Sequence, residues 1–250
     1  MTSHYNIVFV DTPTTLIDCL EDISSPNGTH ARDLAIDLEG VNLSRDGRIA
    51  IIQIVAKGST TVWIVDVTTL GQHAFNHCSP NGQSLRGILE DANITKLFFD
   101  VRNDSDALYA HFGVEMQNVL DLQLLDVASR RSKNMNVLYV SGLARCIDIH
   151  LNGPAGWLET KEAGTRLFSP ERGGSYEVFE QRPIDPVILR YSAQDVVLLF
   201  RLREVLESKI GRFRTNWMNR VVAASASRVA ESMRPTYRPH GYHKAFAQGF

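Results

Sequence analysis

Residues 34–66, LAIDLEGVNLSRDGRIAIIQIVAKGSTTVWIVD, decide the fold that we expect for this chain. They hold three apolar runs rich in β-branched residues, Leu34–Leu38, Ile49–Val55 and Thr61–Asp66, separated by short segments that contain glycine. Parallel neighbours in a sheet need a crossover of a dozen or more residues, which these links do not provide. The three runs therefore predict an antiparallel β-meander.

Further strands and helices are predicted on both sides of the meander. The run Tyr5–Val10 is apolar, and Asp11, Thr12 and Pro13 form a helix-start signature. The elements expected around the meander are a helix over Thr14–Ile23, helices over Ser84–Asp91 and Asp104–Phe112, and short strands over Lys96–Phe99 and Val119–Asp121. This alternation predicts an α/β fold with a mixed central sheet.

The second half of the chain is predicted to be mostly helical. Residues Asn152–Pro186 are rich in glycine, proline and charge, so we expect an irregular segment there. A long helix is expected from about Pro186 to Ile210, where apolar residues give it a broad buried face. The last residues, Arg234–Phe250, lack periodicity and predict a loose tail.

Composition bounds the class of protein and the kind of metal site. The 250 residues are 44% hydrophobic, with 28 Asp+Glu against 26 Lys+Arg, which is typical of a soluble globular protein. Three cysteines are too few for a disulfide framework or a paired-thiol zinc site, so a metal would need oxygen or nitrogen ligands. Neither an apolar stretch of about eighteen residues nor a signal-peptide pattern is present. We therefore expect an intracellular protein, cytoplasmic or nuclear, with no membrane partner.

Three groups of acidic residues lie in apolar surroundings. Asp37 and Glu39 are two residues apart on a predicted strand, so both point to one face; they would either form the polar face of an edge strand or hold a cation. An Asp lies near the start of the helix at residues 104–112, where it could also be a simple cap. Tyr191 and Asp195 share one face of the late helix, one turn apart.

The order of these motifs resembles the DEDD 3'-5' exonucleases. The pattern is D-x-E on an early strand, an Asp after a central strand and Y-x-x-x-D on a late helix, which resembles the tyrosine-containing subfamily with ribonuclease D and the Werner-type exonuclease domain. Arg182, Pro183 and Ile184 resemble the RPL element that precedes the last motif. Residues 100–114, DVRNDSDALYAHFGV, are similar to the eukaryotic branch of Egalitarian-like and piRNA-pathway proteins.

The resemblance implies a fold, a reaction and a set of site residues. The fold would be ribonuclease H-like, with a mixed sheet of about five strands flanked by helices over residues 1–210. The catalytic set would be Asp37, Glu39, Asp104, Tyr191 and Asp195, where Asp104 is preferred to Asp100. The four acids would bind two Mg²⁺ or Mn²⁺ ions, with Asp37 bridging them, and Tyr191 would orient the attacking water.

The expected substrate is the 3' end of single-stranded RNA or DNA, from which nucleoside 5'-monophosphates are released. The alternative function is that of a catalytically weak RNA-binding adaptor, with a protein partner in a small-RNA or RNA-processing complex. Some members of the similar branch have lost acids and serve as scaffolds, whereas this sequence retains all four.

Two basic regions are candidate contacts for nucleic acid. In residues 161–174, the cationic and aromatic side chains that suit phosphate contact and base stacking are Lys161, Arg166, Phe168 and Arg172. The same composition would equally suit a solvated surface loop. Residues 201–250 hold 10 basic and 3 acidic side chains, so we expect 211–250 to be a basic C-terminal extension, partly irregular. His73, His77 and Cys78 suggest zinc only superficially, because a fourth ligand is missing.

Overall fold

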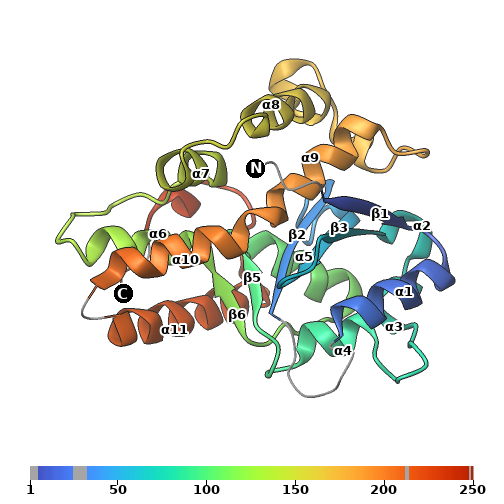
Figure 1. The fold of residues 1–250 in the computed structure, drawn as a ribbon, viewed down its shortest axis with the longest axis horizontal. Helices are drawn as coiled ribbons and strands as arrows, with labels where there is room; N and C mark the ends of the chain where they lie inside the picture. The colour runs from blue at the N-terminus through green and yellow to red at the C-terminus, as the bar shows by residue number, and fades with distance from the viewer. Residues whose placement is uncertain (1–4, 25–32, 212–213, 248, 250) are drawn as a thin grey trace.

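A single mixed sheet forms the centre of the molecule in the computed structural model, which describes residues 5–24, 33–211, 214–247 and 249 (Figure 1). The strand order is β1-β4-β3-β2-β5-β6. The strands are β1 (Asn6–Val10), β2 (Leu34–Val41), β3 (Arg48–Ala56), β4 (Thr61–Asp66), β5 (Lys96–Phe98) and β6 (Val119–Asp121).

The predicted meander is confirmed. β2 pairs with β3 and β3 with β4, both antiparallel, whereas β1, β5 and β6 join the sheet by parallel pairing. The sheet has six strands where about five were expected, because the apolar run near the N-terminus pairs with β4, with Ile7 opposite Val62. The α/β class and the mixed central sheet are as predicted.

Helices cover both faces of this sheet (Figure 1). α1, α4 and α5 pack on the face that carries Ile36 and Ile52, and α6, α9 and α10 pack on the face that carries Ala35 and Ile51. The helices are α1 (Pro13–Ile23), α2 (Val67–Leu70), α3 (His73–Asn76), α4 (Leu85–Glu90), α5 (Arg102–Phe112), α6 (Leu122–Arg131), α7 (Leu143–Leu151), α8 (Trp157–Phe168), α9 (Pro186–Val197), α10 (Leu199–Ile210) and α11 (Arg214–Ser232).

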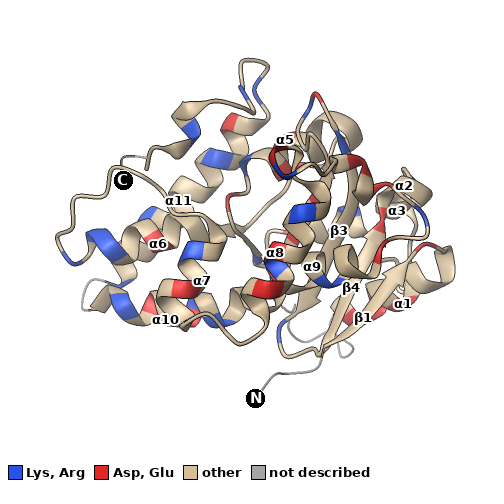
Figure 2. Cartoon of the chain, turned by 90° about the horizontal axis from the view of Figure 1, so that it is seen from above, with Lys and Arg blue, Asp and Glu red and all other residues tan. Residues whose placement is uncertain are grey.

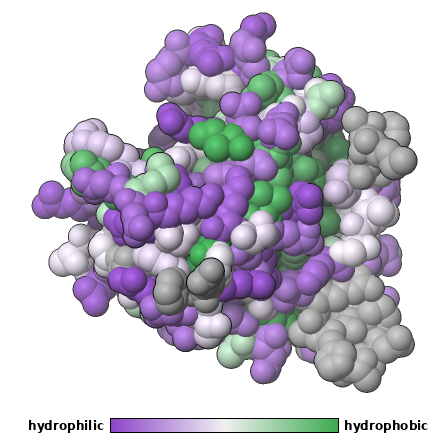
Figure 3. Space-filling model, turned by 60° about the vertical axis from the view of Figure 1, so that its left-hand side comes forward, coloured by the Kyte–Doolittle hydropathy of each residue, from purple (hydrophilic) through white to green (hydrophobic). Residues whose placement is uncertain are grey.

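The outer surface of the helical layer is mostly polar. Figure 3 brings the left-hand side of Figure 1 forward and shows a largely hydrophilic face, with apolar side chains gathered near its centre. Among the helices described, none is both long and apolar enough to cross a membrane.

The segment predicted to be irregular contains helix α8. The indole of Trp157 is buried, and a Cβ at Gly164 would lie 2.4 Å from the ring of Tyr191, so this glycine lets α8 pack directly on α9. The content of glycine and charge suggested a loop, but the glycine serves a close helix–helix contact. The prediction of an irregular segment over Asn152–Pro186 is therefore wrong for the twelve residues of α8, Trp157–Phe168.

The long helix predicted from Pro186 to Ile210 is two helices. α9 ends at Val197 and α10 begins at Leu199. α9 packs on strands β2, β3 and β4, whereas α10 packs on α6 and α7. The chain turns at Leu198 because the two halves lie on different surfaces.

The C-terminal segment is packed rather than loose. α11 packs on β6, α5 and α6. The guanidinium of Arg45 donates to the carbonyl oxygens of Ser232 at 2.7 Å and Arg234 at 2.9 Å, and the Ala247 amide donates to the Leu138 carbonyl at 2.8 Å. The prediction of a loose tail is therefore wrong for the part of residues 234–250 that the structure describes.

A fully buried ion pair fixes the start of α5. The Arg228 guanidinium on α11 donates to the Asp121 carboxylate at 2.7 Å, and both side chains are 0% exposed. The same carboxylate accepts from the backbone amides of Asp100 at 3.0 Å and Val101 at 3.2 Å. Asp121 thus holds the turn between β5 and α5, where Asp100 has a left-handed φ of 66°.

Arg228→Met should therefore destabilise the fold strongly. The substitution leaves the Asp121 carboxylate buried without its cation, which typically costs about 3–5 kcal/mol of the free energy of unfolding. Urea unfolding of both chains measures the difference. Arg201→Met, which breaks an exposed pair with Glu204, is the matched control and should cost at most about 1 kcal/mol. Equal losses in the two variants would contradict the structural role of the buried pair.

Candidate active site

Asp37 and Glu39 project from the interior of the sheet. β2 is an inner strand: it pairs with β3 along its length and with β5 at Leu34 and Ala35, so the alternative of an edge strand is excluded. Both carboxylates are half-buried on the face covered by α9. A β-bulge lies between Glu39 and Gly40. A Cβ atom added at Gly40 would lie 2.0 Å from the Arg48 carbonyl oxygen, so this position requires glycine. Bulges of this kind redirect side chains beside functional sites.

α9 brings a third carboxylate to this pair. Asp195 is 4% exposed, and its ligand atom and those of Asp37 and Glu39 all lie within 4.8 Å of one another. Tyr191, one turn earlier on the same helix, is also 4% exposed. The Asp195 Oδ1 atom is buried and has no hydrogen-bond partner among the described residues.

The fourth acid comes from the first turn of α5. Asp104 is buried, and burial together with repulsion from Asp37 raises the pKa of its carboxyl well above the ordinary value. Its two acidic neighbours are neutralised by arginines: Asp100 pairs with Arg102 at 2.5 Å, and Asp106 pairs with Arg45 at 2.6 Å. Asp104 is thus the acid of this segment that has no arginine partner of this kind and that Asp37 and Glu39 repel.

The cluster concentrates negative charge in a region of low polarity. Burial and repulsion from Asp195 raise the pKa of Asp37 to about 7. Burial likewise raises the pKa of Glu39, with further repulsion from Asp37, and it raises the pKa of Asp195. Carboxyl groups held in this state release their protons readily when a cation approaches.

Lys161 supplies positive charge inside the cluster. Its Nζ atom donates to the Tyr191 hydroxyl at 3.0 Å and to the Asp195 carboxylate, and it lies 4.3 Å from the centre of the Tyr191 ring. Burial alone would lower the pKa of Lys161, but Asp195 and Glu39 raise it. The sequence predicted that Lys161 contacts phosphate from a surface loop. Nothing in the sequence indicated that its ammonium would lie among the acidic side chains.

The other three residues predicted to contact nucleic acid lie outside the acidic cluster. Phe168 packs against the rings of Tyr176, Phe179 and Tyr191, with centroids 5.9, 5.3 and 5.1 Å away. Arg166 donates to Glu162 at 2.8 Å, and Arg172 lies 3.7 Å from the same carboxylate. The structure therefore brings Lys161 and Phe168 to Tyr191 and leaves Arg166 of α8, and Arg172 of the turn that follows α8, at the surface.

The donor set of the cluster fits hard divalent cations. Carboxylate oxygens are the ligands that Mg²⁺ and Mn²⁺ prefer, and one of them, Asp195 Oδ1, lacks any partner within the described residues. Asp37, Glu39 and Asp195 converge closely enough to share an ion, and Asp37 and Glu39 lie near enough to Asp104 to raise its pKa.

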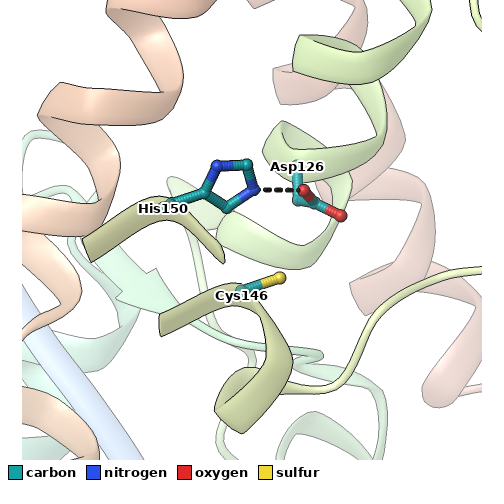
Figure 4. A group of neighbouring side chains, drawn as sticks. All are labelled: Asp126, Cys146 and His150. Atoms are coloured by element: carbon teal, nitrogen blue, oxygen red, sulfur yellow. Dashed lines mark hydrogen bonds and ion pairs between the residues drawn. The ribbon is translucent and has the colours of Figure 1, made fainter. Parts of the chain in front are cut away.

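A second group of metal-capable side chains is Asp126, Cys146 and His150 (Figure 4). His150 Nε2 lies 2.8 Å from Asp126 Oδ1, and its Nδ1 atom lies 2.6 Å from the Lys209 ammonium. Arg130 pairs with the same Asp126 at 2.8 Å. Two cations already surround this group, so it resembles an ion-pair network more than a metal centre. His73, His77 and Cys78 form no such group in the part of the chain that the structure describes.

Comparisons with known proteins place these observations in context. A family model described as a 3'-5' exonuclease matches residues 7–211. The mouse piRNA biogenesis protein EXD1 is 29% identical over 203 residues, which cover 79% of this chain and 34% of that protein. The human piRNA biogenesis protein EXD1 is 30% identical over 175 residues, which cover 69% of this chain and 32% of that protein. The chain thus spans about a third of the length of these two relatives.

The fold is also found among solved structures. The structure of Trypanosoma brucei RNase D superposes with a TM-score of 0.75 at 25% identity, covering 99% of this chain and 80% of that chain.

The crowded carboxylates predict how stability depends on pH without divalent cations. The unfolded chain releases the Asp37 proton near pH 4, whereas the folded chain holds it up to about pH 7. The contribution of Asp37 is thus present below pH 4 and is lost as the pH rises through 7. In EDTA, Asp37→Asn should gain stability relative to the wild type between pH 5 and 7.5, measured by urea unfolding. A difference that does not vary with pH would contradict the raised pKa.

Proposed function

The chain belongs to the 3'-5' exonuclease family, and from this premise we propose that it is an active, metal-dependent nuclease that removes nucleotides from the 3' end of single-stranded RNA or DNA. The observation that carries the proposal is the convergence of Asp37, Glu39 and Asp195, whose ligand atoms lie within 4.8 Å of one another, with the Asp104 carboxyl near enough for Asp37 to raise its pKa. The expected products are nucleoside 5'-monophosphates.

The acids suit the chemistry of a phosphodiester. The bond is an anion that must be attacked by a hydroxide-like nucleophile, so the site has to supply positive charge and hold water in line. Two divalent ions, when bound, supply the charge that activates water and stabilises the leaving 3'-oxygen. In our proposal Asp37 contributes to both ion positions, Glu39 and Asp195 to one, and Asp104 to the other.

Tyr191 and Lys161 would act on the phosphate and the water. The Tyr191 hydroxyl lies beside the Lys161 ammonium at 3.0 Å, and Gly164 and Phe168 pack on its ring, so its orientation is fixed. Burial and the charge of Glu39 raise the pKa of Tyr191 well above its ordinary value, which favours a neutral phenol that donates or accepts a hydrogen bond. We propose that Tyr191 orients the attacking water and that Lys161 neutralises a non-bridging phosphate oxygen.

An RNA-binding adaptor is the second candidate function. The name of the mouse and human relatives, piRNA biogenesis protein, supports a role within an RNA pathway with a protein partner. Such an adaptor would bind single strands without shortening them. The four acids and their fixed geometry favour turnover.

Replacement of single acids tests the proposal. Asp37→Asn and Asp195→Asn should reduce the shortening of 5'-labelled RNA and DNA by at least about a hundredfold, because each removes an ion ligand. The assay compares the purified full chain in Mn²⁺, in Mg²⁺ and in EDTA, on 5'-labelled and 3'-labelled strands. Glu162→Gln on the exposed face of α8 is the control and should retain full activity. A wild-type chain that binds the strands but leaves them intact would support the adaptor instead.

The two residues beside the acids should show different kinetic effects. Tyr191→Phe removes only the hydroxyl, so we expect kcat to fall by about 10²–10⁴-fold with little change in KM. Lys161→Gln should lower kcat/KM, and Lys161→Arg should restore part of it because the charge is kept. Initial rates on a short labelled oligonucleotide measure both. If Tyr191→Phe has the rate of the wild type, the hydroxyl has no role in the reaction.

A further inference from the structure

Three exposed aromatic rings lie together where the C-terminal segment packs on the loop between α6 and α7. Tyr139, Tyr242 and Phe246 are 47%, 70% and 44% exposed. The ring centroids of Tyr139 and Phe246 are 5.3 Å apart with an interplanar angle of 31°, and Tyr242 lies 6.5 and 5.1 Å from the other two. We name these three residues the aromatic platform. Rings so exposed and so close to one another are typical of a binding surface.

The backbone holds the aromatic platform in place. Tyr139 and Phe246 form an antiparallel β-bridge, and the Val140 amide donates to the Ala245 carbonyl at 3.0 Å. The Tyr242 hydroxyl donates to the Tyr139 hydroxyl at 3.3 Å. The platform is therefore built before any ligand arrives, so little conformational entropy is lost when one binds.

The platform adjoins the acidic cluster through Lys244. The Nζ atom of this residue donates to the Asn103 side chain, and the Arg102 guanidinium donates to the Lys244 carbonyl at 3.0 Å. Asn103 directly precedes Asp104, the acid contributed by α5. The segment that carries Tyr242 and Phe246 is thus attached to the helix turn that forms one wall of the active site.

Positive charge surrounds the same segment. A pocket of about 410 Å³ lies between the end of α11 and the segment, and its charged lining residues are two arginines, Arg234 and Arg238, against one acid, Glu231. Figure 2 shows further Lys and Arg residues on the side of the molecule formed by α6, α7 and α10. Exposed rings beside cationic side chains are the combination by which proteins hold single-stranded nucleic acid without reading its sequence.

We propose that the aromatic platform stacks bases of a single-stranded nucleic acid whose 3' end lies at the acidic cluster, while the neighbouring basic residues contact its phosphates. This inference rests on the proposed function, because it assigns the upstream part of the same substrate. In this proposal the C-terminal segment binds the nucleic-acid strand upstream of its 3' end. A second copy of the chain is a less suitable occupant, because the surroundings of the rings carry net positive charge and two such surfaces would repel each other.

The test measures binding in EDTA, where no turnover occurs. The double variant Tyr242→Ala/Phe246→Ala should raise the Kd of the full chain for a 5'-fluorescein-labelled 12-nucleotide RNA at least about fivefold, as the loss of base stacking implies. Tyr242→Phe should bind like the wild type, because it keeps the ring. Tyr109→Ala, which removes an exposed tyrosine of α5, is the matched control and should leave Kd unchanged.

An abasic strand of the same length separates stacking from other contacts. The wild type and the double variant should bind it with the same Kd, because it has phosphates but no bases at the platform. An unchanged Kd for the normal RNA in the double variant would overturn the inference, and so would an equal loss on the abasic strand. A wild-type dimer that becomes monomeric in the double variant, with RNA binding unchanged, would also overturn it by identifying a protein contact.

Crosslinking keeps the inference testable if the double variant does not fold. Wild-type chain irradiated with RNA that contains 5-iodouridine should give peptide adducts at Tyr139, Tyr242 or Phe246, whereas adducts found only elsewhere would contradict the platform. Crosslinking and binding need no turnover, so failure of the inference and failure of the proposed function can be told apart. If binding depends on the rings but Mn²⁺ gives no shortening, the nuclease proposal fails and the platform stands. If a variant without all three rings shortens RNA normally, the platform fails and the nuclease proposal stands.

Discussion

The repulsion among four carboxylates is the constraint on which the rest of this structure depends. Asp37, Glu39, Asp104 and Asp195 lie buried or half-buried, and repulsion from Asp195 raises the pKa of Asp37, while repulsion from Asp37 raises the pKa of Glu39 and of Asp104. Such an arrangement is costly for the folded state, since burial weakens the hydration of every charge in it. The Lys161 ammonium offsets part of that cost through its contacts with Asp195 and Tyr191. A cluster held at this cost is typical of a site that exchanges protons for metal ions.

The remainder of the fold holds these acids in position from three directions. β2 pairs with β3 at both Asp37 and Glu39, so the sheet holds the backbone that carries these two carboxylates. α8 approaches α9 closely because Gly164 has no side chain, and this contact fixes the ring of Tyr191. The buried pair of Asp121 and Arg228 holds the turn that starts α5 and so positions Asp104. α11 supplies the arginine, which makes the C-terminal region part of the support of the site.

The sequence predicts the sheet and the acids well because both depend on local patterns. Apolar, β-branched runs with short links indicate the meander around Asp37, and the spacing of Tyr191 and Asp195 places them on one helix face without any knowledge of tertiary contacts. What could not be predicted depends on distant contacts. Gly164 was interpreted as a loop residue because its partner, the Tyr191 ring, lies 27 residues away in the chain. Likewise Lys161 and the C-terminal segment have positions set by partners that composition does not reveal.

The central claim is that the four carboxylates hold divalent ions at the point where the phosphodiester is cleaved. Anomalous diffraction from crystals of the full chain, grown with Mn²⁺ and a nucleoside 5'-monophosphate, measures this most directly. The account predicts manganese peaks bounded by the carboxylates of Asp37, Glu39, Asp104 and Asp195, with the phosphate of the nucleotide in contact with them. Manganese bound only elsewhere, with the nucleotide remote from the four acids, would contradict it.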